Sequence, residues 1–146
     1  MKVITCAFGA PAVETTTVAV RIPADERHLA LIRGLGDTVC LVAELPLGAA
    51  ADIRLAITEI ATMLVAGSVP GSMLGCAFTY GTDRMSMRAE ATAATEDEVS
   101  GDPLSWELVR MLTSSLSISR DPFDPDVRGY PTVIEFSWER GPFDDT

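Results

Sequence analysis

One stretch of this 146-residue chain decides the fold: Asp52-Ile53-Arg54-Leu55-Ala56-Ile57-Thr58-Glu59-Ile60-Ala61-Thr62-Met63. It lies within residues 49–66, where apolar residues recur at helical spacing. A stripe at i, i+4, i+7 and i+11 predicts one buried helix face: Ile53, Ile57, Ile60 and Leu64. A second stripe runs beside it: Asp52, Ala56, Glu59 and Met63. We therefore expect a long helix that packs on a core and holds Glu59 and Met63 one turn apart.

Alternating and helical patterns continue on both sides of this helix. In chain order they predict strands at 2–8 and 15–22, a helix from an Asp25 N-cap to about Val39, the helix at 49–66, strands at 72–80 and 84–93, a helix at 104–113, and strands at 114–119 and 132–138. Gly34 and Gly36 are poor helix residues, so the first helix is expected to kink or to pack closely against a neighbour there.

One-sided alternation in the strands indicates a sheet with one covered face and one open face. The expected architecture is an α/β (α+β) two-layer sandwich, with a mixed, mostly antiparallel sheet and the helices on one face. The length suits one domain, residues 1–146, in which 141–146 form a loose acidic tail. Hydrophobic residues make up 47% of the chain, which is enough to build a core without metals or disulfides.

Charge and hydropathy exclude several classes of function. Lys and Arg number 11 and Asp and Glu 21, a formal charge of -10, which argues against direct nucleic-acid binding. An acidic surface suits a basic protein partner, although solubility alone also explains it. No apolar run approaches the roughly 20 residues that span a bilayer, and the N-terminus does not resemble a signal peptide. We expect a cytoplasmic protein without membrane contact.

The cysteines and the single histidine predict no reactive centre. Cys6, Cys40 and Cys76 are odd in number, widely spaced and set in apolar runs, so reduced core cysteines are expected and a redox switch has no support. His28 is expected to be a boundary residue. No metal-ligand spacing occurs, and no metal is expected.

At this point the chain resembles the RsbW-like branch of anti-sigma factors and serine-protein kinases, within the GHKL superfamily of histidine-kinase-like ATPases. The resemblance runs from about residue 15 to 138 and is strongest over 52–63 and 108–118. In active members the long helix reads like D-L-x-L-A-V-x-E-x-x-x-N, where the Glu polarises the attacking group and the Asn ligates magnesium. Glu59 matches that Glu, whereas Met63 replaces the Asn. A thioether is a poor magnesium ligand.

Two further family motifs are altered. Ala91 falls where the family has the adenine-reading Asp, and Ala93 where it has the first Gly of D-x-G-x-G. Trp106 stands in the Gly-rich phosphate turn, although the Leu-Val-Arg end of that motif is kept at 108–110. A hydrogen bond to a charged group contributes about 1.5–3 kcal/mol, so losing the Asp alone weakens a nucleotide site by roughly 10–100-fold.

The resemblance therefore implies a degenerate nucleotide pocket at Glu59, Met63, Ala91, Ala93 and Trp106. No cofactor is expected, and residual binding of ATP and magnesium is left open. Alternatives without a role in nucleotide binding also stay open: Glu59 is then a solvated helix residue, and Trp106 is an aromatic side chain of the core or one that fills a groove.

The resemblance further implies an anti-sigma factor of a stress-response type. It would sequester an alternative RNA polymerase sigma factor, release it to an anti-anti-sigma protein of the STAS type, and form a homodimer. The implied partner surface is Glu26, Arg27, Arg33 and Asp37. The alternative is that these charges simply lie on a solvated helix face, where Arg33 and Asp37 could form an i, i+4 pair without any function. Two alternatives remain: an active serine-protein kinase of this family, and a non-enzymatic interaction domain with an unrelated partner.

Overall fold

The structure is a computed structural model, and it describes residues 14–96 and 103–141. The predicted strand at 2–8, Cys6 and the tail from residue 142 lie outside these ranges. The elements are, in chain order, β1 (Thr16–Pro23), a 3₁₀ turn (Glu26–His28), α1 (Leu29–Val42), α2 (Leu47–Gly67), β2 (Met73–Gly81), β3 (Arg84–Ala93), α3 (Pro103–Leu112), β4 (Ser115–Arg120) and β5 (Tyr130–Glu139).

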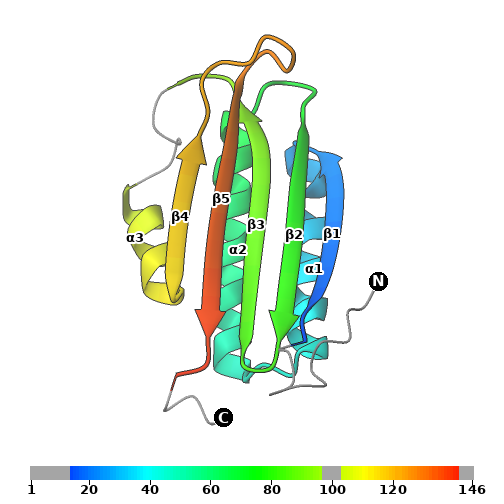
Figure 1. The fold of residues 1–146 in the computed structure, drawn as a ribbon, viewed down its shortest axis with the longest axis vertical. Helices are drawn as coiled ribbons and strands as arrows, with labels where there is room; N and C mark the ends of the chain where they lie inside the picture. The colour runs from blue at the N-terminus through cyan, green and yellow to red at the C-terminus, as the bar shows by residue number, and fades with distance from the viewer. Residues whose placement is uncertain (1–13, 97–102, 142–146) are drawn as a thin grey trace, which may run out of the picture.

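The strands form one sheet in the order β1-β2-β3-β5-β4, with every pair in the described residues antiparallel. Figure 1 shows α1 and α2 side by side on one face of this sheet, with α3 beside β4. The predicted two-layer α+β sandwich is confirmed. The sheet is simpler than the mixed one expected, because the described strands contain no parallel pair.

The core lies between the sheet and the two long helices. The expected stripe of α2 is buried throughout, since none of its four members exceeds 4% exposure: Ile53, Ile57, Ile60 and Leu64. Strand β3 supplies every second side chain to the same core: Met85, Met87, Ala89, Ala91 and Ala93. The strict alternation seen in the sequence therefore corresponds to one buried and one open face.

The start of α1 differs from the prediction. Asp25 is not a side-chain N-cap. Its carboxylate instead contacts His28 Nδ1 at 2.7 Å and the Arg27 guanidinium at 3.6 Å. These contacts, led by the hydrogen bond from His28, lower the pKa of Asp25. A 3₁₀ turn replaces the first α-helical turn, and α1 ends at Val42 rather than near Val39.

The two glycines of α1 have different surroundings. A Cβ on Gly36 would lie 2.6 Å from Ile57 Cδ1, whereas one on Gly34 would meet nothing within 4 Å. Gly36 therefore brings α1 close to α2, which confirms the close packing expected near these residues. Gly34 faces solvent, and no packing requirement explains it.

Candidate functional site

The structure brings Met63, Ala91 and Ala93 together. All three are 7% exposed and line one cavity between the end of α2 and the ends of β3 and β5. Leu64, Gly67, Arg120 and Thr132 complete its wall. The cavity measures about 10 Å³. That is the space of about one water molecule.

Strand register explains this convergence. Ala91 lies opposite Thr132 in the antiparallel pair of β3 and β5. The chain leaving α2 is tied to the end of β3, because Val69 N–H donates to the Thr92 carbonyl and Ala94 N–H donates to the Gly67 carbonyl, each at 2.9 Å. These backbone bonds hold the helix end against the sheet and narrow the space between them.

Thr132 and Arg120 are the residues of this site that sequence reasoning missed. Thr132 is 1% exposed, and its hydroxyl donates to the Tyr130 carbonyl and accepts from Arg120 Nε, both at 3.0 Å. Arg120 also donates to the Thr95 carbonyl at 3.3 Å. The sequence pattern could have indicated Thr132, because it is a polar residue on the same strand face as the apolar Ile134 and Phe136 of β5.

The residues at this cavity do not fit a nucleotide with magnesium. Pockets for small molecules typically have volumes of about 300–1,000 Å³. Met63 offers a buried thioether where magnesium needs hard oxygen ligands. Ala91 and Ala93 offer methyl groups, which cannot accept a hydrogen bond from an adenine amino group. No catalytic step through ATP can be derived from these side chains.

Glu59 and Trp106 do not line this cavity. Glu59 lies half-buried one helical turn before Met63 on α2. Trp106 lies half-buried on α3, where it packs against the core. The five residues predicted as a degenerate pocket are thus divided: three line one cavity and two lie outside it.

The predicted partner residues lie along the first part of the helical layer. Glu26 and Arg27 are exposed on the 3₁₀ turn, Arg33 is half-buried on α1, and Asp37 is exposed. The Arg33–Asp37 pair, which was the alternative explanation of these charges, does not form. Asp37 instead contacts Arg54 of α2, with Oδ2 and Nε 3.5 Å apart. An exposed pair of this kind contributes at most about 1 kcal/mol.

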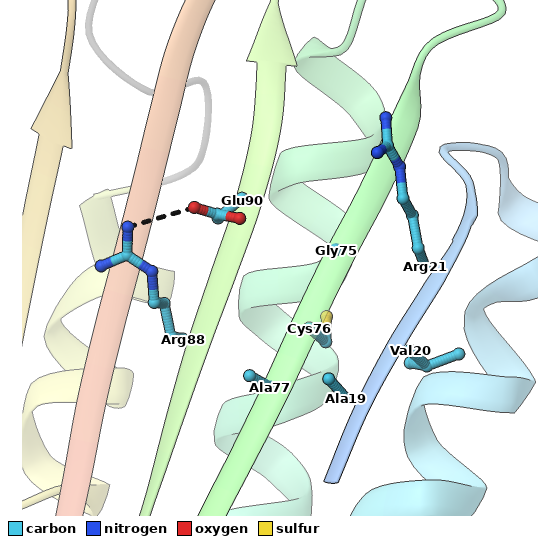
Figure 2. A pocket seen from close by; sticks show the side chains of 8 residues that line it. All are labelled: Ala19, Val20, Arg21, Gly75, Cys76, Ala77, Arg88 and Glu90. Carbon is cyan, nitrogen blue, oxygen red and sulfur yellow. Dashed lines mark hydrogen bonds and ion pairs between the residues drawn. The ribbon is translucent and has the colours of Figure 1, made fainter. Parts of the chain in front are cut away.

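A separate hollow of about 310 Å³ lies on the open face of the sheet. Figure 2 shows its small side chains, Ala19 and Ala77, between Arg21 on β1 and the Arg88–Glu90 pair on β3. Arg88 also contacts Glu135, with Nη1 and Oε1 2.8 Å apart. The carboxylates of Glu90 and Glu135 both contact the Arg88 guanidinium, so its positive charge is neutralised within the protein.

Cys40 and Cys76 are buried and unbonded. Burial raises the pKa of Cys76 to about 12 and, with Asp37 nearby, that of Cys40 to about 11. The expectation of reduced core cysteines is confirmed for these two. Within the described ranges, no helix is both long and apolar enough to cross a membrane.

Comparison with known proteins gives one clear similarity. No protein-family model matches the chain. The chain is similar to the anti-sigma-F factor RsbW of Mycobacterium tuberculosis, in the strains CDC 1551 / Oshkosh and ATCC 25618 / H37Rv. The identity to each is 30% over 112 residues, which cover 77% of this chain and 67% of the relative.

Proposed function

Because the chain belongs to the RsbW-like family of anti-sigma factors and serine-protein kinases, we propose that it sequesters a sigma factor by protein binding without using ATP. The proposal that the protein does not use ATP rests on the cavity of about 10 Å³ at Met63, Ala91 and Ala93. This supports the proposal because phosphoryl transfer depends on positioning and metal electrostatics, and Met63, Ala91 and Ala93 supply no oxygen ligand for a metal.

The proposed partners follow from the family. The sigma factor would contact the surface of Glu26, Arg27, Arg33 and Asp37, and an anti-anti-sigma protein would compete for it. Of these residues, Arg33 has no ion-pair partner within 4 Å in the described part of the chain, so its charge is available to a partner. A cytoplasmic homodimer that acts in a stress response is part of the same proposal.

The first experiment is capture of the tagged protein from lysate of its own cells, with identification by mass spectrometry. A sigma factor should be recovered in about equal amount. It should be retained after washing with EDTA and apyrase, because the complex needs no nucleotide. The Arg33→Glu variant should lose most of it, while Arg128→Glu, an exposed arginine outside that surface, should retain it. Capture without any sigma factor would reject the assignment and favour an unrelated partner.

An active kinase is the second candidate, and it rests on the retained Glu59. It predicts transfer of labelled phosphate from ATP to an anti-anti-sigma protein, with loss of transfer in Glu59→Ala. We expect no transfer by the wild-type protein. Transfer that depends on Glu59 would overturn the interpretation of Met63, Ala91 and Ala93.

A restoration experiment tests the cavity directly. We expect the double variant Met63→Asn, Ala91→Asp to bind ATP with magnesium no better than the wild type, because the new side chains add ligands but no volume. Isothermal titration calorimetry measures the affinity, and the melting temperature shows whether the variant is folded. A dissociation constant below about 100 µM in a folded variant would mean that the end of α2 still opens for a nucleotide.

A further inference from the structure

Three large aliphatic side chains stand exposed where α1 turns into α2. Leu41, Val42 and Leu47 are 78%, 58% and 87% exposed, and we refer to these three residues as the apolar corner. The turn beneath them is well ordered by hydrogen bonds: Leu45 N–H donates to the Cys40 carbonyl at 3.1 Å, and Ala50 N–H to the Pro46 carbonyl at 2.9 Å. The apolar corner is therefore presented on a fixed backbone at one end of the helical layer (Figure 1).

A recess of about 470 Å³ adjoins the apolar corner through Val42. It lies between the α1–α2 turn and the β2–β3 turn, which Figure 1 shows at the same end of the molecule. Its charged residues are three acids and one base: Glu14, Glu44, Asp83 and Arg140. Arg140 contacts Asp83, whereas Glu44 is exposed and has no ion pair among the residues that the structure describes, so the described wall beside the apolar corner is acidic. We refer to this recess as the acidic recess.

These two features side by side favour one kind of occupant. Burying an exposed leucine-sized side chain contributes about 1.5–3 kcal/mol, which favours an apolar surface on the partner. The acidic recess favours cationic side chains and opposes acidic ones. A second copy of this chain, with its formal charge of -10, would bring like charge to the recess. An anionic membrane surface is disfavoured for the same reason.

We propose that the apolar corner and the acidic recess dock a basic amphipathic helix of a partner protein. Its leucine-type side chains lie on Leu41, Val42 and Leu47, and a Lys or Arg side chain enters the recess beside Glu44. This surface goes beyond the proposed sigma-factor contact. The proposed sigma-factor surface begins about 20 Å away, at Glu26 before α1, and ends at Asp37, one helical turn before Leu41, but the two surfaces share no residue. The two surfaces can therefore be tested separately.

The test uses two fluorescein-labelled peptides of 14 residues and the full chain. Both peptides carry Leu at the same helical positions, one with Lys elsewhere and one with Glu elsewhere. Fluorescence anisotropy should show binding of the Lys peptide only. The double variant Leu41→Ser, Leu47→Ser should weaken binding about tenfold or more. Glu44→Gln should weaken it less and reduce its dependence on salt.

The matched control is Leu104→Ser, Met111→Ser, which removes two equally exposed apolar side chains from α3. It should leave the affinity unchanged. The proposal is overturned if the Lys peptide does not bind, if both peptides bind alike, or if the control weakens binding as much as the corner variant. Sedimentation velocity without peptide should show the same oligomeric state for wild type and corner variant. A dimer lost in the corner variant would make a second copy the occupant and would also overturn the proposal.

Discussion

Met63 and Ala91 present a thioether and a methyl group to the cavity at the end of α2. The cavity wall also contains a polar pair, in which the buried Thr132 bonds the half-buried Arg120. The Thr132 hydroxyl donates to the Tyr130 carbonyl and accepts from Arg120 Nε. At the scale of single residues, no buried side-chain nitrogen or oxygen in the described part of the chain lacks a hydrogen-bond partner.

The Thr132–Arg120 network should contribute to stability. We expect Thr132→Val to lower the free energy of unfolding by about 1–3 kcal/mol, because it leaves the Arg120 Nε donor and the Tyr130 carbonyl without this partner. Urea unfolding followed by circular dichroism measures the change. Thr58→Val is the control, since the Thr58 hydroxyl bonds only the Arg54 carbonyl of its own helix. An equal loss in both variants would contradict a special role for Thr132.

The two described cysteines should be inert in the folded protein. Their pKa values of about 11 and 12 lie above the ordinary 9.0, so at pH 8 the thiolate fraction falls by roughly 100-fold for Cys40 and roughly 1,000-fold for Cys76. In a Cys6→Ser variant, which removes the third thiol, Ellman's reagent should react with neither until urea unfolds the chain. Rapid reaction of the native protein would contradict their burial.

The same pKa values set the direction of a pH effect. The folded state holds these thiol protons more tightly than the unfolded state does. Their contribution is therefore complete below pH 9 and is lost as the pH rises from about 9 through 11 and 12. The Cys76→Ala variant should show a shallower loss of melting temperature between pH 9 and 10.5 than the wild type.

At the scale of elements, the two glycines of α1 allow helix propensity to be compared with the packing of α1 on α2. Gly34→Ala should raise the free energy of unfolding by about 0.5–1 kcal/mol, because it favours the helix and fills open space. Gly36→Ala should show no such gain, because Ile57 Cδ1 must move aside for the new Cβ in the packed space between α1 and α2, and that cost offsets the gain in helix propensity. Chemical unfolding of the two variants measures both. Stabilisation by both would mean that Ile57 moves aside freely.

At the scale of the whole molecule, the formal charge of -10 acts on association. We expect the rate of association with the sigma factor to fall about tenfold or more when NaCl rises from about 50 to about 500 mM, while the dissociation rate changes little. Stopped-flow fluorescence measures both rates. The opposite division, with the salt effect in dissociation alone, would indicate that local ion pairs rather than the overall field dominate.

Periodicity predicted most of the described elements of the fold. The stripe of α2 and the alternation of β3 are strong local signals, because burial on one face repeats every 3.6 or every two residues. The boundaries were less well predicted. The start of α1 depends on whether the Asp25 carboxylate bonds the helix backbone or the His28 ring. Both partners lie within three residues of Asp25, so the sequence does not decide between them.

By itself the sequence determined the helix and strand types, the covered face of the sheet, the acidic charge and the resemblance to an anti-sigma family. Only the tertiary structure decided that Met63, Ala91 and Ala93 share one small cavity while Glu59 and Trp106 lie outside it. It alone paired Asp37 with Arg54 and Thr132 with Arg120. The physical reason is that such contacts join residues of different elements, through the register of β5 with β3 and β4 and the packing of α1 on α2, which no local pattern encodes.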